Sequence, residues 1–343
     1  MPPVSTDPVV ATAYADLGDD EQAEALRPVA VAAAEEFGLD VVRLEVLLHS
    51  YNTTFDVGTA DGGRYAMRVN TNSQSTGPEV LAQQAWQLAI AAETPVTVPV
   101  PRVTRDGDWC ARRFSQALGR EVLVTCASWL EGDDVGEPDP DQAHALGRAM
   151  AHLHIHAARW VMPRGGTMPV FDDPLFGDED RLTGAPGLDE EQHEVLRRAH
   201  ERAVDAFGHT VSAGPLVPLH ADLHGGNLKW HEGRLAVFDF DDCGIGAPAL
   251  DLAISTFYLR GDGSDAVESA LRAGYAEVAP LPDVGPEAFE ALVASRQLLL
   301  GNDLLGSTTA GLRERSGDYL VTTVDRLRHW LETGRFTRAL PGG

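Results

Sequence analysis

The hydrophobic pattern in the first part of the chain changes from helical to strand-like near residue 40. Apolar residues recur at helical spacing across residues 19–37, and Gly38 follows them as a C-cap. Pro28 lies within this segment, so we expect it to kink or divide the helix. Beyond Val41 the pattern predicts three strands, at 43–48, 53–57 and 64–69. One helix and three strands suit a small mixed lobe.

Prolines and glycine-containing turns divide the rest of the chain. Pro78 suits the first turn of a helix, where its missing N–H is not needed, and residues 80–92 continue that helix. Further strands are expected at 109–114 and 121–128. Further helices are expected at 141–158, 188–207, 265–278, 286–305 and 312–333. The pattern therefore predicts an α+β chain, with a small β-rich part followed by a larger, mostly helical part.

Two short apolar strands interrupt the helical part, at 215–219 and 235–238, and each ends in polar residues. The first strand is followed by His220, Asp222, His224 and Asn227, and the second by Asp239, Asp241 and Asp242. Strand ends hold reactive side chains on a rigid backbone. Because a hairpin joins the two strands, we expect Asp222, Asn227 and Asp239 to lie close together.

The residue types and their spacing predict a phosphoryl-transfer site. Mg²⁺ prefers hard oxygen ligands and fills its remaining positions with water and substrate phosphates. In the kinase catalytic loop, an Asp accepts the hydroxyl proton of the substrate, and an Asn five residues later and a strand-end Asp hold metal. Asp222, Asn227 and Asp239 follow this order. We therefore predict Asp222 as the catalytic base, and Asn227 and Asp239 as ligands of Mg²⁺ bound with ATP.

The two loops also carry a family resemblance. The stretches His220-Ala-Asp222-Leu-His224-Gly-Gly-Asn227 and Val-Phe-Asp239-Phe-Asp241-Asp242 resemble the aminoglycoside phosphotransferase and choline kinase-like superfamily, in particular its homoserine kinase-type and stress response kinase A-type members. The resemblance covers the chain from about Val41 onward, although only these two stretches are specific. It implies a bilobal protein-kinase-like fold and the ATP-dependent phosphorylation of a hydroxyl group.

The resemblance also implies a domain arrangement. Residues 1–127 would form the nucleotide-covering lobe, 128–133 the hinge, and 134–343 the helical lobe that carries catalysis and substrate binding. His220 is expected to brace its loop through hydrogen bonds, and Asp251 to tie the loop to the following helix.

Nucleotide-binding residues are implied by position in the family pattern. Arg68 stands where the family has a phosphate-binding lysine, and the acidic partner of that residue is undecided between Glu79 and Gln83. Ser50 and Asn52 lie in a turn that can meet phosphate groups, and the backbone around Thr125 and Ser128 would meet the adenine. Substrate contacts in the family often lie on the helix at 286–305, here Arg296, Asn302 and Asp303, although a solvated face is an equal alternative.

Two other functions stay open at this point. His220, Asp222 and His224 alternate along an extended segment, and such an arrangement can bind the metal of a hydrolase. The arginine at position 68, with its undecided acidic partner, instead raises the alternative of a nucleotide-binding pseudokinase that acts through a partner. The presence of Asp222, Asn227 and Asp239 argues against it. Stoichiometric zinc would indicate the first alternative, and the absence of turnover the second.

Composition limits the partners. The chain has 52 acidic against 27 basic residues, a net charge of −25, which argues against nucleic-acid and anionic membrane partners. Its three cysteines have no CxxC spacing, and no apolar run is long enough to span a membrane. We therefore expect a cytoplasmic monomer or homodimer that acts on a small molecule. The acceptor, and the choice of ATP or GTP, are not predicted.

Overall fold

The protein is described from a computed structural model, which describes residues 14–73, 75–261, 265–307 and 309–340. The N-terminal elements are α2 (Asp19–Ala25), α3 (Arg27–Glu36), β1 (Val41–His49), β2 (Thr53–Thr59), β3 (Arg64–Val69), α4 (Gly77–Glu93), β4 (Ala111–Ser115) and β5 (Arg120–Ser128). The predicted helix over 19–37 is therefore two helices. Pro28 lies in the first turn of α3, so it divides the segment as expected.

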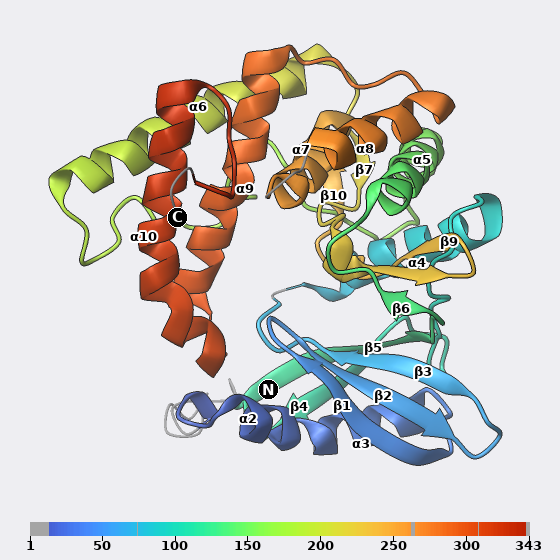
Figure 1. Ribbon diagram of the computed structural model, residues 1–343. Helices are drawn as coiled ribbons and strands as arrows, with labels where there is room; N and C mark the ends of the chain where they lie inside the picture. Colours follow the sequence, from blue (N-terminus) through green and yellow to red (C-terminus); the bar gives the residue numbers. More distant parts are fainter. Residues whose placement is uncertain (1–13, 74, 262–264, 308, 341–343) are drawn as a thin grey trace.

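The strands form a five-stranded antiparallel sheet in the order β1-β2-β3-β5-β4 (Figure 1). Helix α3 packs against β3 and β4, and the buried residues between helix and sheet include Phe37, Phe55 and Met67. Side chains alternate between the two faces of a strand. Because Met67 of β3 points into this core, its neighbour Arg68 points to the opposite face, toward the helical part of the protein.

The helical part contains most of the remaining chain. Its elements are β6 (Asp133–Asp134), α5 (Pro140–Ala157), α6 (Glu190–Ala213), β7 (Val217–Leu219), the 3-10 helix η1 (Gly225–Asn227), β8 (Leu228–His231), β9 (Arg234–Val237), β10 (Gly244–Gly246), α7 (Pro248–Leu259), α8 (Asp265–Val278), α9 (Pro286–Gly306) and α10 (Ala310–Thr333). The small sheet β6-β8-β9 lies on its side facing the larger sheet, and the sheet β10-β7 lies among its helices (Figure 1). No helix of the described residues is long and apolar enough to cross a membrane.

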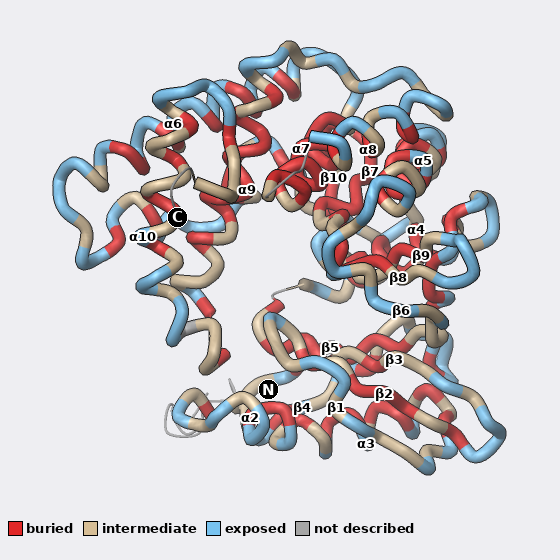
Figure 2. The backbone as a smooth tube through the Cα atoms, in the orientation of Figure 1, coloured by how far each residue is buried: buried red, intermediate tan, exposed pale blue. Residues whose placement is uncertain are grey.

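The buried residues form two hydrophobic clusters, one in each part of the molecule (Figure 2). Helix α4 precedes β4 and β5 in the chain, yet its buried residues Ala82, Trp86 and Ile90 belong to the cluster of the helical part. The edge of Trp86 packs against the ring of Phe240, which follows the predicted metal ligand Asp239. Helix α4 therefore connects the β-rich lobe to the loop after β9. The predicted domain boundaries themselves stay a prediction.

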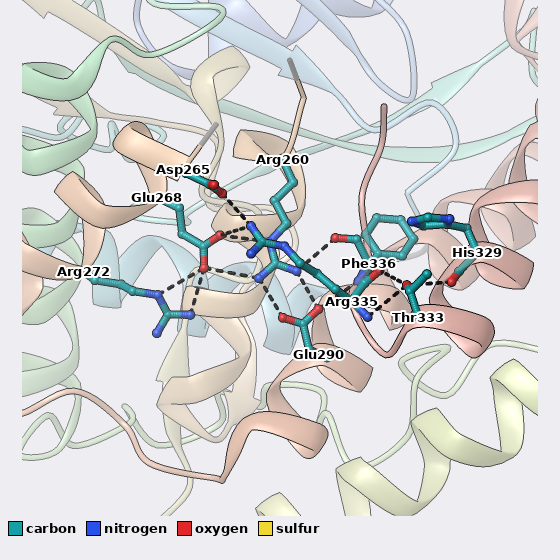
Figure 3. Close-up of polar contacts among 9 residues, drawn as sticks. All are labelled: Arg260, Asp265, Glu268, Arg272, Glu290, His329, Thr333, Arg335 and Phe336. Carbon is teal, nitrogen blue, oxygen red and sulfur yellow. Dashed lines mark hydrogen bonds and ion pairs between the residues drawn. The ribbon is translucent and has the colours of Figure 1, made fainter. Parts of the chain in front are cut away.

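A buried arginine holds the C-terminal segment to the helical part (Figure 3). Arg260, at the end of α7, is only 3% exposed. Its guanidinium donates to Glu268 of α8 (2.9 Å), to Glu290 of α9 (2.6 and 2.8 Å) and to the carbonyl oxygen of Phe336 (3.0 Å). The N–H of Phe336 in turn donates to Glu290 at 2.9 Å. This network fixes the path of the chain beyond α10.

Removal of this arginine should therefore destabilise the protein. Without Arg260 the half-buried carboxylate of Glu290 loses its guanidinium partner, and buried Glu268 keeps Arg272 as its near partner, so we expect Arg260→Gln to lower the free energy of unfolding by about 2 kcal/mol. The matched control is Arg197→Gln, because Arg197 on α6 is exposed and pairs with exposed Glu194 and Glu201, outside this network. It should change the stability by less than about 0.5 kcal/mol. Urea denaturation of both variants measures this, and equal effects would contradict the structural role of Arg260.

Candidate active site

The loop after β7 is held by a buried carboxylate, as expected for Asp251. Asp251 is fully buried and accepts hydrogen bonds from the backbone N–H of Ala221 (2.7 Å) and of His220 (3.2 Å). Nε2 of His154 lies 3.0 Å from the same carboxylate. Ala221 adopts a positive φ of 62°, which is costly for a residue with a side chain. Asp251 thus stabilises a strained turn that brings the next residue, Asp222, to the cavity.

His220 braces the loop and is not free to bind a metal. Its Nδ1 accepts a hydrogen bond from the N–H of Asp222 (3.3 Å), and its Nε2 lies 3.0 Å from the carbonyl oxygen of Phe238. This pattern fits the neutral ring that donates through Nε2. Burial also lowers the pKa of His220, which favours the same form. The predicted bracing role is confirmed.

The ligand set of a hydrolase is therefore incomplete. With both nitrogens of His220 occupied, only Asp222 and His224 of the proposed set are left. Nδ1 of His224 accepts from the N–H of Gly226 (3.0 Å), and its ring stacks on Tyr258. Within the described part of the chain, no group of three or more His, Cys, Asp and Glu side chains could hold a metal ion. Mg²⁺ bound together with a nucleotide needs fewer protein ligands, because phosphates supply the others.

Asp222, Asn227 and Asp239 line one cavity, as the strand ends predicted. Nδ2 of Asn227 donates to the carbonyl oxygen of Asp222 (2.9 Å) and to its carboxylate (2.7 Å). The N–H of Phe238 donates to the carbonyl oxygen of Asn227 (3.0 Å), which joins the two loops just before Asp239. Asp239 has a positive φ of 64°, a second strained residue at this cavity. The cavity has a volume of about 810 Å³ and opens between the β-rich lobe and the helical part.

Arg68 crosses from the sheet to these carboxylates. Its Nη1 lies 2.6 Å from Oδ1 of Asp239, and its Nη2 contacts Asp241. Neither candidate on α4 pairs with Arg68: Glu79 accepts from the N–H of Thr76 and caps the helix. Gln83 donates to the carbonyl oxygen of Asp241 at 2.8 Å. The ion pair expected within the β-rich lobe is therefore replaced by one across the cavity.

Of the other four residues predicted to contact the nucleotide, two line the cavity and two do not. Ser50 and Asn52, between β1 and β2, line it, and Nδ2 of Asn52 donates to Asp241 at 2.7 Å. Thr125 and Ser128 of β5 are not among the lining residues. The side-chain oxygen of Ser128 accepts from the N–H of Val100 (2.9 Å), so it is used within the protein. A contact of Thr125 and Ser128 with adenine stays a prediction.

Arg296 of α9 is the strongest partner of Asp222 and was not predicted in that role. It is 5% exposed, and its Nη2 contacts Oδ1 of Asp222 and lies 3.1 Å from the hydroxyl of Tyr258. Burial opposes ionisation of Asp222, but the charge of Arg296 and the hydrogen bond from His224 outweigh burial and lower the pKa of Asp222 to about 2. Asp222 is therefore a carboxylate at neutral pH.

Further carboxylates face the same space. Burial and the charges of Asp222 and Asp239 raise the pKa of Asp242 to about 7, although its side chain is open to the cavity and water weakens this effect. Burial and the charge of Asp178 likewise raise the pKa of Asp303 to about 6, against the opposing charge of Arg296. Asn302, in contrast, is fully buried and binds the backbone of residues 179 and 181.

A comparison with family models decides the class of the protein. Residues 45–289 match the model described as the phosphotransferase enzyme family (APH). The chain belongs to the phosphotransferase enzyme family. This confirms the resemblance drawn from the two loops, together with the bilobal kinase-like α+β fold and the class of enzyme.

Two kinases resemble this chain over part of their length. Amicoumacin kinase of Bacillus subtilis is 22% identical over 230 residues, which are 66% of each chain. Homoserine kinase of Parvibaculum lavamentivorans is 32% identical over 183 residues, which are 49% of this chain and 54% of that enzyme. The matched region thus spans just under two thirds of the first relative and about half of the second. The hydrolase and pseudokinase alternatives are not favoured, since both relatives are named as kinases.

A solved structure has the same fold. Amicoumacin kinase hAmiN, in complex with AMP-PNP, Ca²⁺ and Ami, superposes with a TM-score of 0.70. The two chains are 18% identical, and the superposition covers 87% of this chain and 93% of that one. At this identity the similarity shows a shared fold and no more.

The glycine in the Asp222–Asn227 loop gives a testable consequence of this geometry. A Cβ atom built on Gly225 would lie 1.7 Å from the carbonyl oxygen of Gly136, and backbone atoms cannot move aside as a side chain does. We expect Gly225→Ala to lower the free energy of unfolding by about 1–3 kcal/mol. The control Gly208→Ala, in α6 with no atom within 4 Å, should be neutral or stabilising. Chemical denaturation measures both, and an unaffected Gly225→Ala variant would contradict the close approach.

Proposed function

We propose that the protein transfers the γ-phosphoryl group of ATP or GTP to a hydroxyl group of a small molecule. The observation that carries this proposal is the meeting of Asp222, Asn227, Asp239 and Arg68 at one cavity between the two parts of the molecule. Cavities of this size accept a nucleotide together with a small acceptor. Family membership supports phosphoryl transfer, and the AMP-PNP and Ca²⁺ bound to amicoumacin kinase support a nucleotide and a divalent cation here.

Asp222 is the base in this proposal. The amide of Asn227 and the guanidinium of Arg296 hold its carboxylate. The orientation of the carboxylate oxygens is therefore set by the protein before the substrate binds. The acceptor O–H gives its proton to Asp222, its oxygen forms a bond to the γ-phosphorus, and the bond from that phosphorus to the bridging oxygen breaks to release ADP or GDP. A carboxylate with a pKa of about 2 is a weak base, so its main contribution is to orient the hydroxyl group.

Asn227 and Asp239 are the residues that would hold Mg²⁺. The amide nitrogen of Asn227 is used by Asp222, so its side-chain oxygen is the atom left for a cation. The side chain of Asp239 is 39% exposed, and its present partner, Arg68, supplies a positive charge. Such hard oxygen donors fit Mg²⁺, which would neutralise phosphate charge when it is bound. Arg68 is then available to the nucleotide phosphates, as its family position implies.

A cytoplasmic location, a monomeric or homodimeric state and the absence of nucleic-acid partners belong to the same proposal. They rest on the acidic composition and on the class of enzyme.

The direct test of the base is Asp222→Asn. Loss of the proton acceptor should lower kcat by at least about 100-fold, while the Kd for the nucleotide stays within about threefold. ADP release in a coupled assay and nucleotide titration measure the two quantities. The control is Asp205→Asn on the exposed face of α6, which should leave both unchanged. An Asp222→Asn variant with wild-type turnover would refute the assignment.

The pH profile tests the Arg296–Asp222 pair. Arg296 lowers the pKa of Asp222, so the wild-type enzyme should keep the ionised base down to about pH 4. In Arg296→Gln the pKa of Asp222 should rise. The acid limb of kcat/KM should then move to higher pH, because the base becomes protonated at a higher pH than in the wild type. Circular dichroism at each pH separates this shift from unfolding. Superimposable acid limbs would contradict the pair.

A further inference from the structure

Arginines line the helical end of the cavity, away from the sheet. Arg296 of α9, Arg326 of α10 and Arg338 of the C-terminal segment all face it, together with the phenol rings of Tyr258 and Tyr319. Arg296 is committed to Asp222. Arg326 and Arg338 take no part in the mechanism described above.

The two remaining arginines have no acidic partner in the described part of the chain. Nη1 of Arg326 donates to the side-chain oxygen of Gln297 (3.0 Å), and its Nε donates to the carbonyl oxygen of Arg338 (2.9 Å). Nη1 of Arg338 donates to the carbonyl oxygen of Tyr258 (3.2 Å). Every acceptor described for them is thus a neutral oxygen. This is unusual in a chain with 52 acidic and 27 basic residues, where carboxylates are abundant.

The arrangement is held in place by the protein and costs free energy. Arg338 lies two residues after Phe336, which Arg260 holds, and the N–H of Arg338 donates to the carbonyl oxygen of Arg260 at 3.0 Å. Both Arg326 and Arg338 are half-buried. Burial and the like charge of Arg338 lower the pKa of Arg326, in spite of the nearby hydroxyl of Tyr319. Partly buried like charges are unfavourable unless an anion compensates them.

Arg296, which binds the base, and Arg338 both lie near the ring of Tyr258. The guanidinium carbon of Arg296 lies 5.6 Å from the ring centre of Tyr258, and that of Arg338 lies 5.7 Å from the same ring. The ring of Tyr258 therefore lies near both the arginine that binds Asp222 and an arginine that has no described acidic partner. A molecule whose hydroxyl group reaches Asp222 can bring a second group to Arg338 and Arg326.

We propose that the acceptor is an alcohol that also carries an oxyanion group, a carboxylate or a phosphate, and that Arg326 and Arg338 bind this group. The inference rests on the proposed function and names its substrate class. Guanidinium groups match carboxylate and phosphate oxygens with paired, charge-assisted hydrogen bonds. Asp303 and Asp242, which line the same cavity, are available to a cationic group elsewhere on the acceptor.

The test is a panel of acceptors that differ by one group. Homoserine carries a hydroxyl, an amine and a carboxylate, propanolamine lacks the carboxylate, γ-hydroxybutyrate lacks the amine, and propanol lacks both. α-Glycerophosphate carries a phosphate in place of the carboxylate. We expect kcat/KM for an anionic acceptor to exceed that of its counterpart without the anion by about 10- to 100-fold. The preferred anion distinguishes a carboxylate site from a phosphate site.

Arginine variants assign the effect to this cluster. Arg326→Gln and Arg338→Gln should each raise KM for the anionic acceptors by about tenfold or more, with little change for propanolamine. Arg338→Lys should restore part of the effect. The matched controls are Arg328→Gln on α10 and Arg335→Gln, since neither residue lines the cavity and each pairs with an acidic side chain. Thermal denaturation and nucleotide titration establish that the variants are folded.

Each outcome decides the proposal. Equal use of propanolamine and homoserine, or arginine variants with unchanged kinetics, would overturn it. If no member of the panel is phosphorylated, calorimetry with γ-hydroxybutyrate and α-glycerophosphate in the presence of AMP-PNP and Mg²⁺ replaces the assay. Binding that both glutamine variants lose supports the site, and no binding, or binding that they retain, refutes it. Failure of phosphoryl transfer is seen separately, as the absence of any Asp222-dependent nucleotide turnover.

Discussion

Electrostatic repulsion among carboxylates is the constraint on which this site depends. Asp222, Asp239, Asp241 and Asp242 come from two adjoining loops and face one cavity. Without compensation, like charges at such distances raise one another's pKa and oppose folding of the loops. The compensation comes from two arginines on different parts of the molecule. Arg68 reaches Asp239 and Asp241 from the sheet, and Arg296 reaches Asp222 from α9.

This distribution of charge explains why the site lies between two hydrophobic clusters. Neither the β-rich lobe nor the helical part balances the carboxylates alone, so the contacts of Arg68 also join the two parts. The strained backbone at Ala221 and Asp239 is maintained by the same surroundings, through Asp251 on one side and the Phe238–Asn227 hydrogen bond on the other. A nucleotide phosphate and a cation at this cavity would compete with the carboxylates and with Arg68 for the same contacts.

The sequence predicted those features that depend on residues close together along the chain. The meeting of Asp222, Asn227 and Asp239 at one cavity could be predicted because short loops at two joined strand ends restrict where their side chains can lie. The division of the first helix at Pro28 followed from local backbone chemistry. The partner of Arg68 could not be predicted, because Asp239 is 171 residues away and the choice depends on how the two parts of the molecule pack. The pairing of Arg296 with Asp222, across 74 residues, was missed for the same reason. Arg326 and Arg338 carried no signal, since isolated arginines on a helix and in a tail are typical of a solvated surface.

The central claim is that Asp239, now neutralised by Arg68, holds the divalent cation that accompanies the nucleotide. Calorimetric titration of AMP-PNP with and without Mg²⁺, in wild type and in Asp239→Asn, tests it most directly. The account predicts that Mg²⁺ tightens binding to the wild type by at least about tenfold, and that this gain disappears in the variant. An equal gain from Mg²⁺ in both proteins, or none in the wild type, would contradict it.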